Sequence, residues 1–441
     1  MSPEATRLSA THRSATRPTW LHWVVLFLLA ISVAINYVDR GNLSVALSSI
    51  EKEIHLGKDE LGILGMAFFV SYSVLQIFAG KLIDRFNVIW VYALGYLVWS
   101  GATALTGLVH GFTFAGFTMS SFAVLFSLRL LLGLGESVAF PCYAKILSGS
   151  FPEGLRGTAN AAIDCCTKIG PAVGIMLGVE LVSKFGWRMM FIAIGVVSLT
   201  WLLPWCLLAP HLRLRQLISH IDPPPYREIL SKRPFWGTVL GLFGANYTWY
   251  FFLTWLPYYF EKERHYSSDR LAFFGSLPFW GVGISSMCVG MIADAIIRRG
   301  RDAVRVRQAT VSLGLIGCCC LMLPAVAIQN EALSLSLLMV ACLCFGLFSS
   351  NHFALVQALS GPEAAGRWTG VQNGLGNCAG IVAPWITGAI LGATHSFFLA
   401  FATACGVLLL GVTGYWFVVG KSGRVAWSTE KQPEPASPMA V

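Results

Sequence analysis

Two charged side chains of opposite sign stand next to one another inside a long apolar run. Residues 20–47 predict a membrane-spanning helix, and Asp39 and Arg40 lie in its second half. A charge at that depth costs about 3 kcal/mol, so each side chain needs a partner, a water-filled cavity or a function. Neighbouring residues point about 100° apart around a helix and cannot form an ideal pair. We therefore expect Asp39 and Arg40 to contact different groups.

A second acid and base, Arg129 and Glu136, lie seven residues apart in the apolar run 116–144. Seven residues are two helical turns, so both side chains lie on one face. An apolar setting favours the neutral form of a carboxyl group, whereas a neighbouring guanidinium favours the ionised form. The charge of this site therefore depends on what pairs with Arg129, which is a usable device for proton coupling. A permanent Arg129–Glu136 ion pair is the structural alternative.

A third pair, Asp164 and Lys168, lies in the run 156–182 with a spacing that favours an ion pair on one helix face. The pair either neutralises itself against other helices, or Lys168 offers a second cation to a substrate. Gly170, Pro171 and Gly174 follow in the same run. We interpret them as a glycine-rich helix contact with a proline bend, in preference to an antiporter signature.

The C-terminal part of the chain offers polar and aromatic side chains in place of charges within its apolar runs. Tyr247, Tyr250 and Tyr258 lie in the run 235–260. Their hydroxyl groups either donate to a ligand or lie at helix contacts and the membrane interface. His352 has two interpretations as well. A lone histidine inside a membrane is more often a hydrogen-bonded packing residue, and contact with a ligand is the alternative.

The elements that hold these side chains are predicted from composition and hydropathy. The chain has 441 residues, of which 55% are hydrophobic and 12% are charged, against about 25% charged residues in a soluble domain. Apolar runs long enough to cross a hydrocarbon core of about 30 Å recur throughout. The sequence predicts an all-α membrane protein with twelve transmembrane helices, at about 20–47, 61–83, 88–110, 116–144, 156–182, 187–209, 235–260, 270–297, 306–328, 332–358, 367–393 and 396–420.

Other functional classes are disfavoured. The basic residues separate the spans and form no continuous patch, so no nucleic-acid partner is expected. The 12 cysteines lie mostly inside spans, without the spacing of a metal site. No nucleophile and base are arranged for catalysis. We expect neither an enzyme nor a bound metal or cofactor.

The basic residues also predict the orientation of the chain. With a cytoplasmic N-terminus, the inner segments hold 21 Lys and Arg residues, the outer loops hold seven, and three lie inside spans. This asymmetry predicts that both termini are cytoplasmic. The expected organisation is a tail over 1–19, a six-helix half over 20–209, a cytoplasmic linker over 210–234, a second half over 235–420 and a disordered tail over 421–441.

An internal repeat divides the spans six and six. Gly80 and Asp84 follow the second span, and Gly290 and Asp294 follow the eighth, at an offset of 210 residues. Pro152-Glu153 and Pro362-Glu363 recur at the same offset, ahead of spans five and eleven. Duplicated halves are typical of secondary transporters, whose substrate sites lie near the midplane between the halves.

Here the chain resembles the major facilitator superfamily along nearly its whole length. Gly80–Arg85 resembles the signature of the loop between spans two and three, and Arg129–Gly135 resembles the signature of span four. Within the superfamily, Asn36–Leu43, Arg129–Pro141 and Gly186–Arg188 resemble the anion:cation symporter family. That family includes bacterial galactonate, glucarate and hexuronate permeases and the sialin-type carriers of animals.

The resemblance implies roles for individual residues. Arg40 would bind the substrate anion, Asp39 and Glu136 would carry protons, and Arg129 would be linked to Glu136. Other positions that match the family's pocket are Tyr37, Tyr72, Thr167, Ser350, His352, Phe353 and Asn373, to which we add Tyr247. Residues expected to govern conformational change are Gly80, Asp84, Arg85, Gly290 and Asp294. Residues that depart from the pattern of a sugar-acid pocket are Thr167, Lys168, Leu242, His352 and Phe353, so an aromatic acid, a dicarboxylate or another carboxylate is an open alternative.

The expected function is proton-coupled uptake of a small organic anion, a carboxylate or sugar acid, by alternating access of two halves. The carrier is expected to work as a monomer in a lipid bilayer, the plasma membrane or bacterial inner membrane. An exchanger or exporter of the same fold is the nearest alternative. A ligand sensor without transport is a further one, disfavoured because no large signalling domain is present.

Overall fold

The computed structural model describes residues 20–114, 117–150, 153–211, 224–421 and 423–428. The described chain is almost wholly helical, apart from one short antiparallel hairpin of β1 (Phe112–Phe114) and β2 (Phe117–Met119). The expected tail 1–19 and the central part of the expected linker lie outside the described residues.

The N-terminal half carries the helices that hold the predicted charges. Its elements, in chain order, are α2 (Trp20–Ile54), α3 (Lys58–Arg85), α4 (Val88–Thr106), α5 (Ser121–Glu136), α6 (Ala139–Ser150), α7 (Glu153–Leu199), α8 (Leu202–Leu208) and the 3-10 turn η1 (Ala209–His211).

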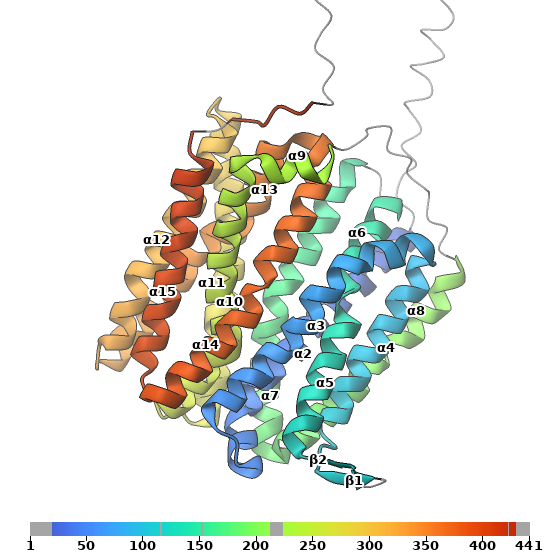
Figure 1. Cartoon of the computed structure of the whole chain (residues 1–441), viewed down its shortest axis with the longest axis vertical. Coiled ribbons are helices and arrows are strands. Elements are labelled where there is room, and N and C mark those ends of the chain that lie inside the picture. Colours follow the sequence, from blue (N-terminus) through green and yellow to red (C-terminus); the bar gives the residue numbers. More distant parts are fainter. Residues whose placement is uncertain (1–19, 115–116, 151–152, 212–223, 422, 429–441) are drawn as a thin grey trace, which may run out of the picture.

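The C-terminal half follows a short helix at the end of the linker, α9 (Tyr226–Ser231). Its elements are α10 (Arg233–Lys262), α11 (Ser268–Arg298), α12 (Ala303–Ala327), α13 (Glu331–Asn377), α14 (Ala379–Thr394), α15 (Phe397–Thr413) and the π-helix η2 (Gly414–Val419). The two halves lie side by side in Figure 1.

Glycines with positive φ break the two longest helices. α7 contains Gly186 at φ 79° and α13 contains Gly361 at φ 66°, conformations that cost little only for glycine. α7 therefore covers two expected spans, and α13 covers one span and the beginning of the next, which α14 completes. Nine helices within the described ranges are long and apolar enough to cross a membrane. The predicted all-α membrane fold is confirmed.

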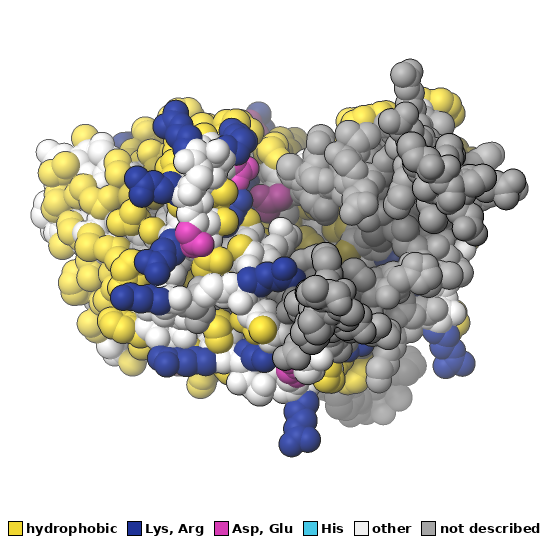
Figure 2. Space-filling view, turned by 90° about the horizontal axis from the view of Figure 1, so that it is seen from above, with side chains coloured by type: hydrophobic (Ala, Val, Ile, Leu, Met, Phe, Trp, Pro, Cys, Tyr) yellow, Lys and Arg dark blue, Asp and Glu magenta, His cyan; other side chains and the backbone are white. Residues whose placement is uncertain are grey.

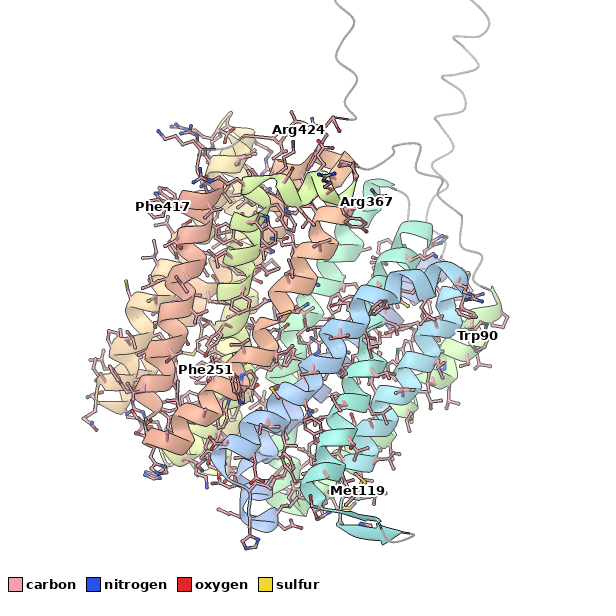
Figure 3. All side chains as sticks on the ribbon, viewed as in Figure 1. Trp90, Met119, Phe251, Arg367, Phe417 and Arg424 are labelled. Atoms are coloured by element: carbon pink, nitrogen blue, oxygen red, sulfur yellow. The ribbon has the colours of Figure 1, made fainter. Side chains whose placement is uncertain are left out.

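The molecule has two distinguishable ends. We call the end that carries α9, where Arg367 and Arg424 lie, the terminal side. We call the end that carries the β1–β2 hairpin, where Met119 lies, the distal side (Figures 1 and 3). Since α4 leads into β1, α2 and α4 both run from the terminal side to the distal side, and α3 runs back.

Glycines let the two halves meet closely at the distal side. A Cβ placed on Gly62 of α3 would lie 2.8 Å from the carbonyl oxygen of Pro384 in α14, and one on Gly388 would lie 2.8 Å from the Cα of Gly62. These backbones touch because neither residue has a side chain. From this contact the ribbons of α3 and α14 diverge toward the terminal side (Figure 1).

Glycines also seat α2 against α7. A Cβ on Gly170 would lie 2.5 Å from the Cβ of Tyr37, and one on Gly174 would lie 3.1 Å from the Cα of Val38. The glycines that follow Lys168 therefore form the expected helix contact, and Pro171 lies within α7 beside them. This contact fixes the position of Tyr37 and of the charged turn that follows it.

The expectation of a disordered tail from residue 421 is wrong for Val425–Ser428. Trp427 is only 4% exposed and packs into a small apolar cluster with Ile229 and Trp368. Its indole nitrogen donates to the carbonyl oxygen of Ser360 at 2.7 Å. Ser428 donates two hydrogen bonds to Glu228, which lower the pKa of that carboxyl group. Val425 packs against the same cluster, and its backbone N–H donates to the carbonyl oxygen of Leu359 at 2.8 Å, so apolar contacts and hydrogen bonds together dock this segment.

We predict that Trp427→Ala destabilises the protein by about 3 kcal/mol, because the substitution empties the centre of this cluster. The measurement is thermal unfolding of the purified protein in detergent. Trp416→Ala is the matched control, since Trp416 is 53% exposed on the outer surface. Equal melting temperatures for the two variants would show that the tail contributes no stability.

Candidate functional site

A buried ion pair joins α2 to the end of α5. The Nε atom of Arg40 donates to Oε2 of Glu136 at 2.7 Å, and the two residues are 5% and 0% exposed. Sequence spacing put Arg129 and Glu136 on one face of α5. The structure gives Glu136 the guanidinium of another helix, because α2 packs against the last turn of α5.

Aromatic rings surround the guanidinium of Arg40. Its central carbon lies 4.6 Å from the ring centroid of Tyr72, 4.8 Å from that of Tyr37 and 5.1 Å from that of Phe68. Cation–π attraction partly replaces the lost hydration of the charge. Within the described part of the chain, Nη2 of Arg40 and Oε1 of Glu136 have no hydrogen-bond partner. Arg40 can therefore take a further acceptor.

Arg129 also lies near the ring of Phe68. It is 5% exposed, and its central carbon is 5.6 Å from the centroid of that ring. Arg129 is close enough to Glu136, Asp39 and Arg40 to interact electrostatically with all three. Arg40 and Arg129 both line a cavity of about 10 Å³, room for about one water molecule. Leu253 and Thr254 of α10 complete its lining, so the cavity lies between the halves.

Asp39 has different neighbours from Arg40. It is 1% exposed and accepts a hydrogen bond from Nδ2 of Asn42 at 3.4 Å through Oδ1. Its Oδ2 atom has no hydrogen-bond partner among the residues described. Asp39 interacts with Thr103 and Tyr96 of α4. The carboxylate of Asp39 thus lies on the side of α2 that faces α4, next to the Arg40–Glu136 ion pair.

The wall opposite Arg40 comes from the C-terminal half. Tyr250 interacts electrostatically with Arg40, and its ring centroid is 4.2 Å from that of Phe69 in α3. The hydroxyl of Tyr250 donates to Oδ1 of Asn377 at 2.6 Å, and Asn246 donates to the same atom at 3.4 Å. Sequence reasoning missed Asn377. Its position one helical turn after Asn373 was the available signal.

The pair of Asp164 and Lys168 lies where α7 meets α11. Nζ of Lys168 donates to Oδ1 of Asp164 at 3.0 Å and to Oγ1 of Thr167 at 2.8 Å. A Cβ on Gly283 of α11 would lie 3.2 Å from the Cβ of Lys168. Asp164 also interacts electrostatically with Tyr37. The pair is thus a neighbour of the aromatic cage around Arg40, at the boundary between the halves.

Other predicted pocket residues have contacts elsewhere. Nδ1 of His352 lies 2.8 Å from the hydroxyl of Tyr415 in η2, and its ring stacks on Phe348. These contacts lie inside the C-terminal half. Phe353 is 41% exposed and contacts the His352 ring. Tyr247 is buried in α10 and Asn373 is half-buried in α13, and neither has a described contact with the aromatic cage around Arg40. The side chain of Ser350 lies outside the described residues.

The residues expected to govern conformational change lie near those ends of their helices that face the terminal side. Asp294 accepts from Arg307 at 2.7 Å, and Arg307 donates to Asn351 at 3.2 Å, which ties α11, α12 and α13 together. Arg85 is exposed at the end of α3, and Gly290 is half-buried in α11. The side chains expected at positions 80 and 84 lie outside the described residues.

Charged side chains close the distal side above the ion pair. Glu51 of α2 lies 3.6 Å from Nζ of Lys262 in α10 and accepts from the hydroxyl of Tyr258 at 2.7 Å. Lys58 of α3 also contacts both Glu51 and Tyr258. Ser48, one helical turn before Glu51 in α2, donates to Glu261 of α10 at 2.5 Å. We call these residues the distal network; it links the two halves.

Comparisons with known proteins agree with this architecture. The chain is 28% identical over 452 residues to the probable galactarate/D-glucarate transporter GudP of Bacillus subtilis, covering 96% of this chain and 98% of the relative. It is 28% identical over 437 residues to the D-galactonate transporter of Escherichia coli O6:H1, covering 93% and 99%.

A solved structure has the same fold. It is a bacterial homologue of the human lysosomal transporter Spinster, in an inward-facing and unoccupied conformation. The TM-score is 0.75 at 15% sequence identity, and the match covers 90% of this chain and 97% of that one. The family model described as Major Facilitator Superfamily matches residues 29–384. The chain belongs to the Major Facilitator Superfamily and is a multi-pass membrane transporter similar in sequence to sugar-acid carriers.

Proposed function

We propose that this transporter takes up a small organic anion, a carboxylate or sugar acid, together with one or more protons. The observation that carries the proposal is the buried Arg40–Glu136 pair, because it joins an anion-binding group to a group that can be protonated. Arg40 offers planar N–H donors suited to a carboxylate. Asp39 and Arg129 adjoin the pair and complete a charge network that is confined to the N-terminal half.

Coupling follows from competition for Arg40. While Glu136 is ionised, it holds Nε of Arg40 by a charged hydrogen bond. Protonation of Glu136 removes that charge and leaves the guanidinium uncompensated in an apolar cage. A substrate carboxylate then restores neutrality by binding to Arg40. Proton and anion therefore favour each other's binding, and neither moves alone without leaving a buried charge.

Because the described contacts between the halves include a close-packed distal side, they favour a state that opens toward the terminal side. Glycine contacts and the distal network hold the distal ends together. The terminal side would be cytoplasmic, since Lys and Arg gather over the C-terminal half on that face in Figure 2. Exposed basic residues there include Arg227, Arg233, Arg298, Arg299, Arg301 and Arg305. The structure then corresponds to the inward-facing state, which releases substrate.

The substrate pocket would lie between the Arg40 cage and the Tyr250–Asn377 pair. Hydroxyl and amide groups in that wall suit an oxygen-rich anion, and the relatives named above carry names of sugar acids. Lys168 stands close by with Asp164 as its partner. D-glucarate, galactarate and D-galactonate are therefore the first compounds to test.

We predict that one of these three acids raises the melting temperature of the purified protein, because ligand at about 100 times its Kd stabilises by about 2.7 kcal/mol. The neutral sugar D-galactose is the control and should give no shift. Arg40→Met should remove the shift, since the carboxylate loses its guanidinium. A shift of full size in that variant would contradict the assignment of Arg40.

We predict that Glu136→Gln abolishes accumulation driven by a pH gradient, because the amide keeps the hydrogen bond to Arg40 but cannot ionise. Uptake by wild-type proteoliposomes should rise as the external pH falls. Counterflow of the acid with the largest thermal shift needs no net proton movement and should survive in the variant. Accumulation that still follows the pH gradient would exclude Glu136 as the coupling site. Exchange without any pH dependence in the wild type would favour an exchanger.

We predict that a cross-link between Ser48→Cys and Glu261→Cys stops transport, because the distal side must open to load substrate. Proteoliposome uptake is measured before and after oxidation and again after reduction, which should restore it. Arg270→Cys with Glu331→Cys is the matched control: these residues also pair at the distal side, but within one half. Full uptake by the cross-linked test variant would mean that the distal network need not separate.

A further inference from the structure

A polar stripe runs along the side of α2 that faces α4. Its members are Ser32, Asn36, Asp39 and Asn42, spaced four, three and three residues apart, and each is at most 1% exposed. That spacing keeps the four side chains on one helix face. Such a stripe is unusual in a membrane helix, where polar groups need partners.

A matching stripe runs along α4. Tyr92, Tyr96, Ser100 and Thr103 are all buried. The hydroxyl of Tyr92 lies 2.5 Å from that of Ser32, which fixes the register of the two helices at one point. Both helices run in the same direction with the same rise per residue. Asn36 is therefore level with Tyr96 and Asp39 with Trp99, so Ser100 and Thr103 lie within about one turn of the level of Asp39.

Few of these facing groups bond to each other directly. Asp39 interacts with Thr103 and Tyr96, yet neither hydroxyl forms a hydrogen bond of good geometry with it. Within the described residues, eight buried polar atoms along the two stripes form no hydrogen bond of good geometry: Nδ2 and Oδ1 of Asn36, Oδ2 of Asp39, Oδ1 of Asn42, the Tyr96 hydroxyl, Nε1 of Trp99 and the hydroxyls of Ser100 and Thr103. Three pairs come close to such a bond, namely Thr103 with Asp39, Ser100 with Tyr96 and Asn36 with Glu136.

The chemistry of these atoms selects their ligand. Each unsatisfied buried polar atom costs about 1–3 kcal/mol, so the few among them that have no close polar neighbour already cost several kcal/mol, a large part of a protein's stability. A sodium ion would satisfy only the oxygens and would leave the N–H groups of Asn36 and Trp99 unpaired. Water both donates and accepts, and buried waters typically bond to such groups. The mixture of donors and acceptors therefore favours water.

We propose that a cluster of ordered water molecules lies between α2 and α4, solvates Asp39 and connects it with Glu136. Asn36 completes the connection, since it lies one turn from Asp39 and is near Glu136. The cluster is separate from the anion site, which lies on the opposite side of Arg40. Asn36, Ser100 and Thr103 are then positioning residues for these waters. The relay described next rests on the proposed proton coupling, but the hydration itself does not.

The cluster gives a proton a path that avoids the substrate. The O–H bond of protonated Asp39 breaks, each water accepts one proton and donates another, and an O–H bond forms at Oε1 of Glu136. The negative charge moves from Glu136 to Asp39, and nothing is oxidised or reduced. Toward the terminal side, hydroxyls continue the line: Ser32 bonds Tyr92, and the Tyr92 hydroxyl lies 2.9 Å from that of Tyr143 in α6.

Hydroxyl-radical footprinting of the purified full-length protein in detergent tests the hydration. X-ray radiolysis of bound water should oxidise Tyr96 and Trp99 although both are buried. After the protein is mixed with ¹⁸O water, the oxygen incorporated into these two side chains should change only slowly from ¹⁶O to ¹⁸O. Trp205 is the control, because it is equally buried and its indole nitrogen bonds the carbonyl oxygen of Ile89. Protection of Tyr96 and Trp99 equal to that of Trp205 would overturn the proposal. If Tyr96 and Trp99 are oxidised in choline chloride but not in sodium chloride, the site holds a sodium ion, and the water cluster is refuted.

Transport by hydroxyl-free variants tests the relay. Thr103→Val should lower pH-gradient-driven accumulation by at least tenfold and leave counterflow within twofold of the wild type, and Thr103→Ser should restore accumulation. Thr106→Val is the matched control: its hydroxyl bonds the Ala102 carbonyl of its own helix, and both activities should be unchanged. An equal fall of both activities in Thr103→Val would overturn the relay.

The two tests separate the inference from the proposed function. If wild-type uptake ignores pH, proton coupling fails, whereas oxidation of Tyr96 and Trp99 still decides whether water is present. If uptake follows pH but these residues are protected, proton coupling stands and the water cluster is refuted.

Discussion

The constraint on which the structure depends is a guanidinium and a carboxylate buried together in an apolar bundle. Removing each ion from water costs several kcal/mol, and attraction offsets that cost only when the geometry is good. Arg40 meets the requirement with Glu136 on one side and aromatic rings around it. α2, α3 and α5 must therefore approach one another closely at one level of the membrane.

Small residues make this approach possible. Gly170 and Gly174 bring α7 against α2 beside Tyr37, which forms part of the cage. A Cβ on Gly133 of α5 would lie 2.2 Å from the carbonyl oxygen of Phe68, the residue whose ring lies close to both guanidiniums. The glycines are thus as much a part of the site as the charges, because a methyl group at either contact would move a wall of the cage.

Residue type and spacing identified the charges but not their partners. Asp39, Arg40 and Glu136 stand out because ionised groups are rare in apolar runs. Helical periodicity gives the face of each helix and is silent about its neighbour, so the partner of Glu136 emerged only from packing. Asn377 and Trp427 were missed for a related reason. The role of a single polar residue in a span, or of a tryptophan in a mostly polar tail, depends on contacts with residues that are distant in the sequence.

The backbone contact of Gly62 with Gly388 has a consequence for the resting balance of the two states. A contact made without side chains buries little apolar surface and orders no rotamers, so its separation is inexpensive. What holds the distal side closed then includes the charges around Glu51 and Lys262, which are partly exposed, beside apolar contacts such as that of Phe69 with Tyr250. Salt screens such charges. Ionic strength on the distal side should accordingly bias the resting population, a property that neither the buried site nor the helix packing would confer.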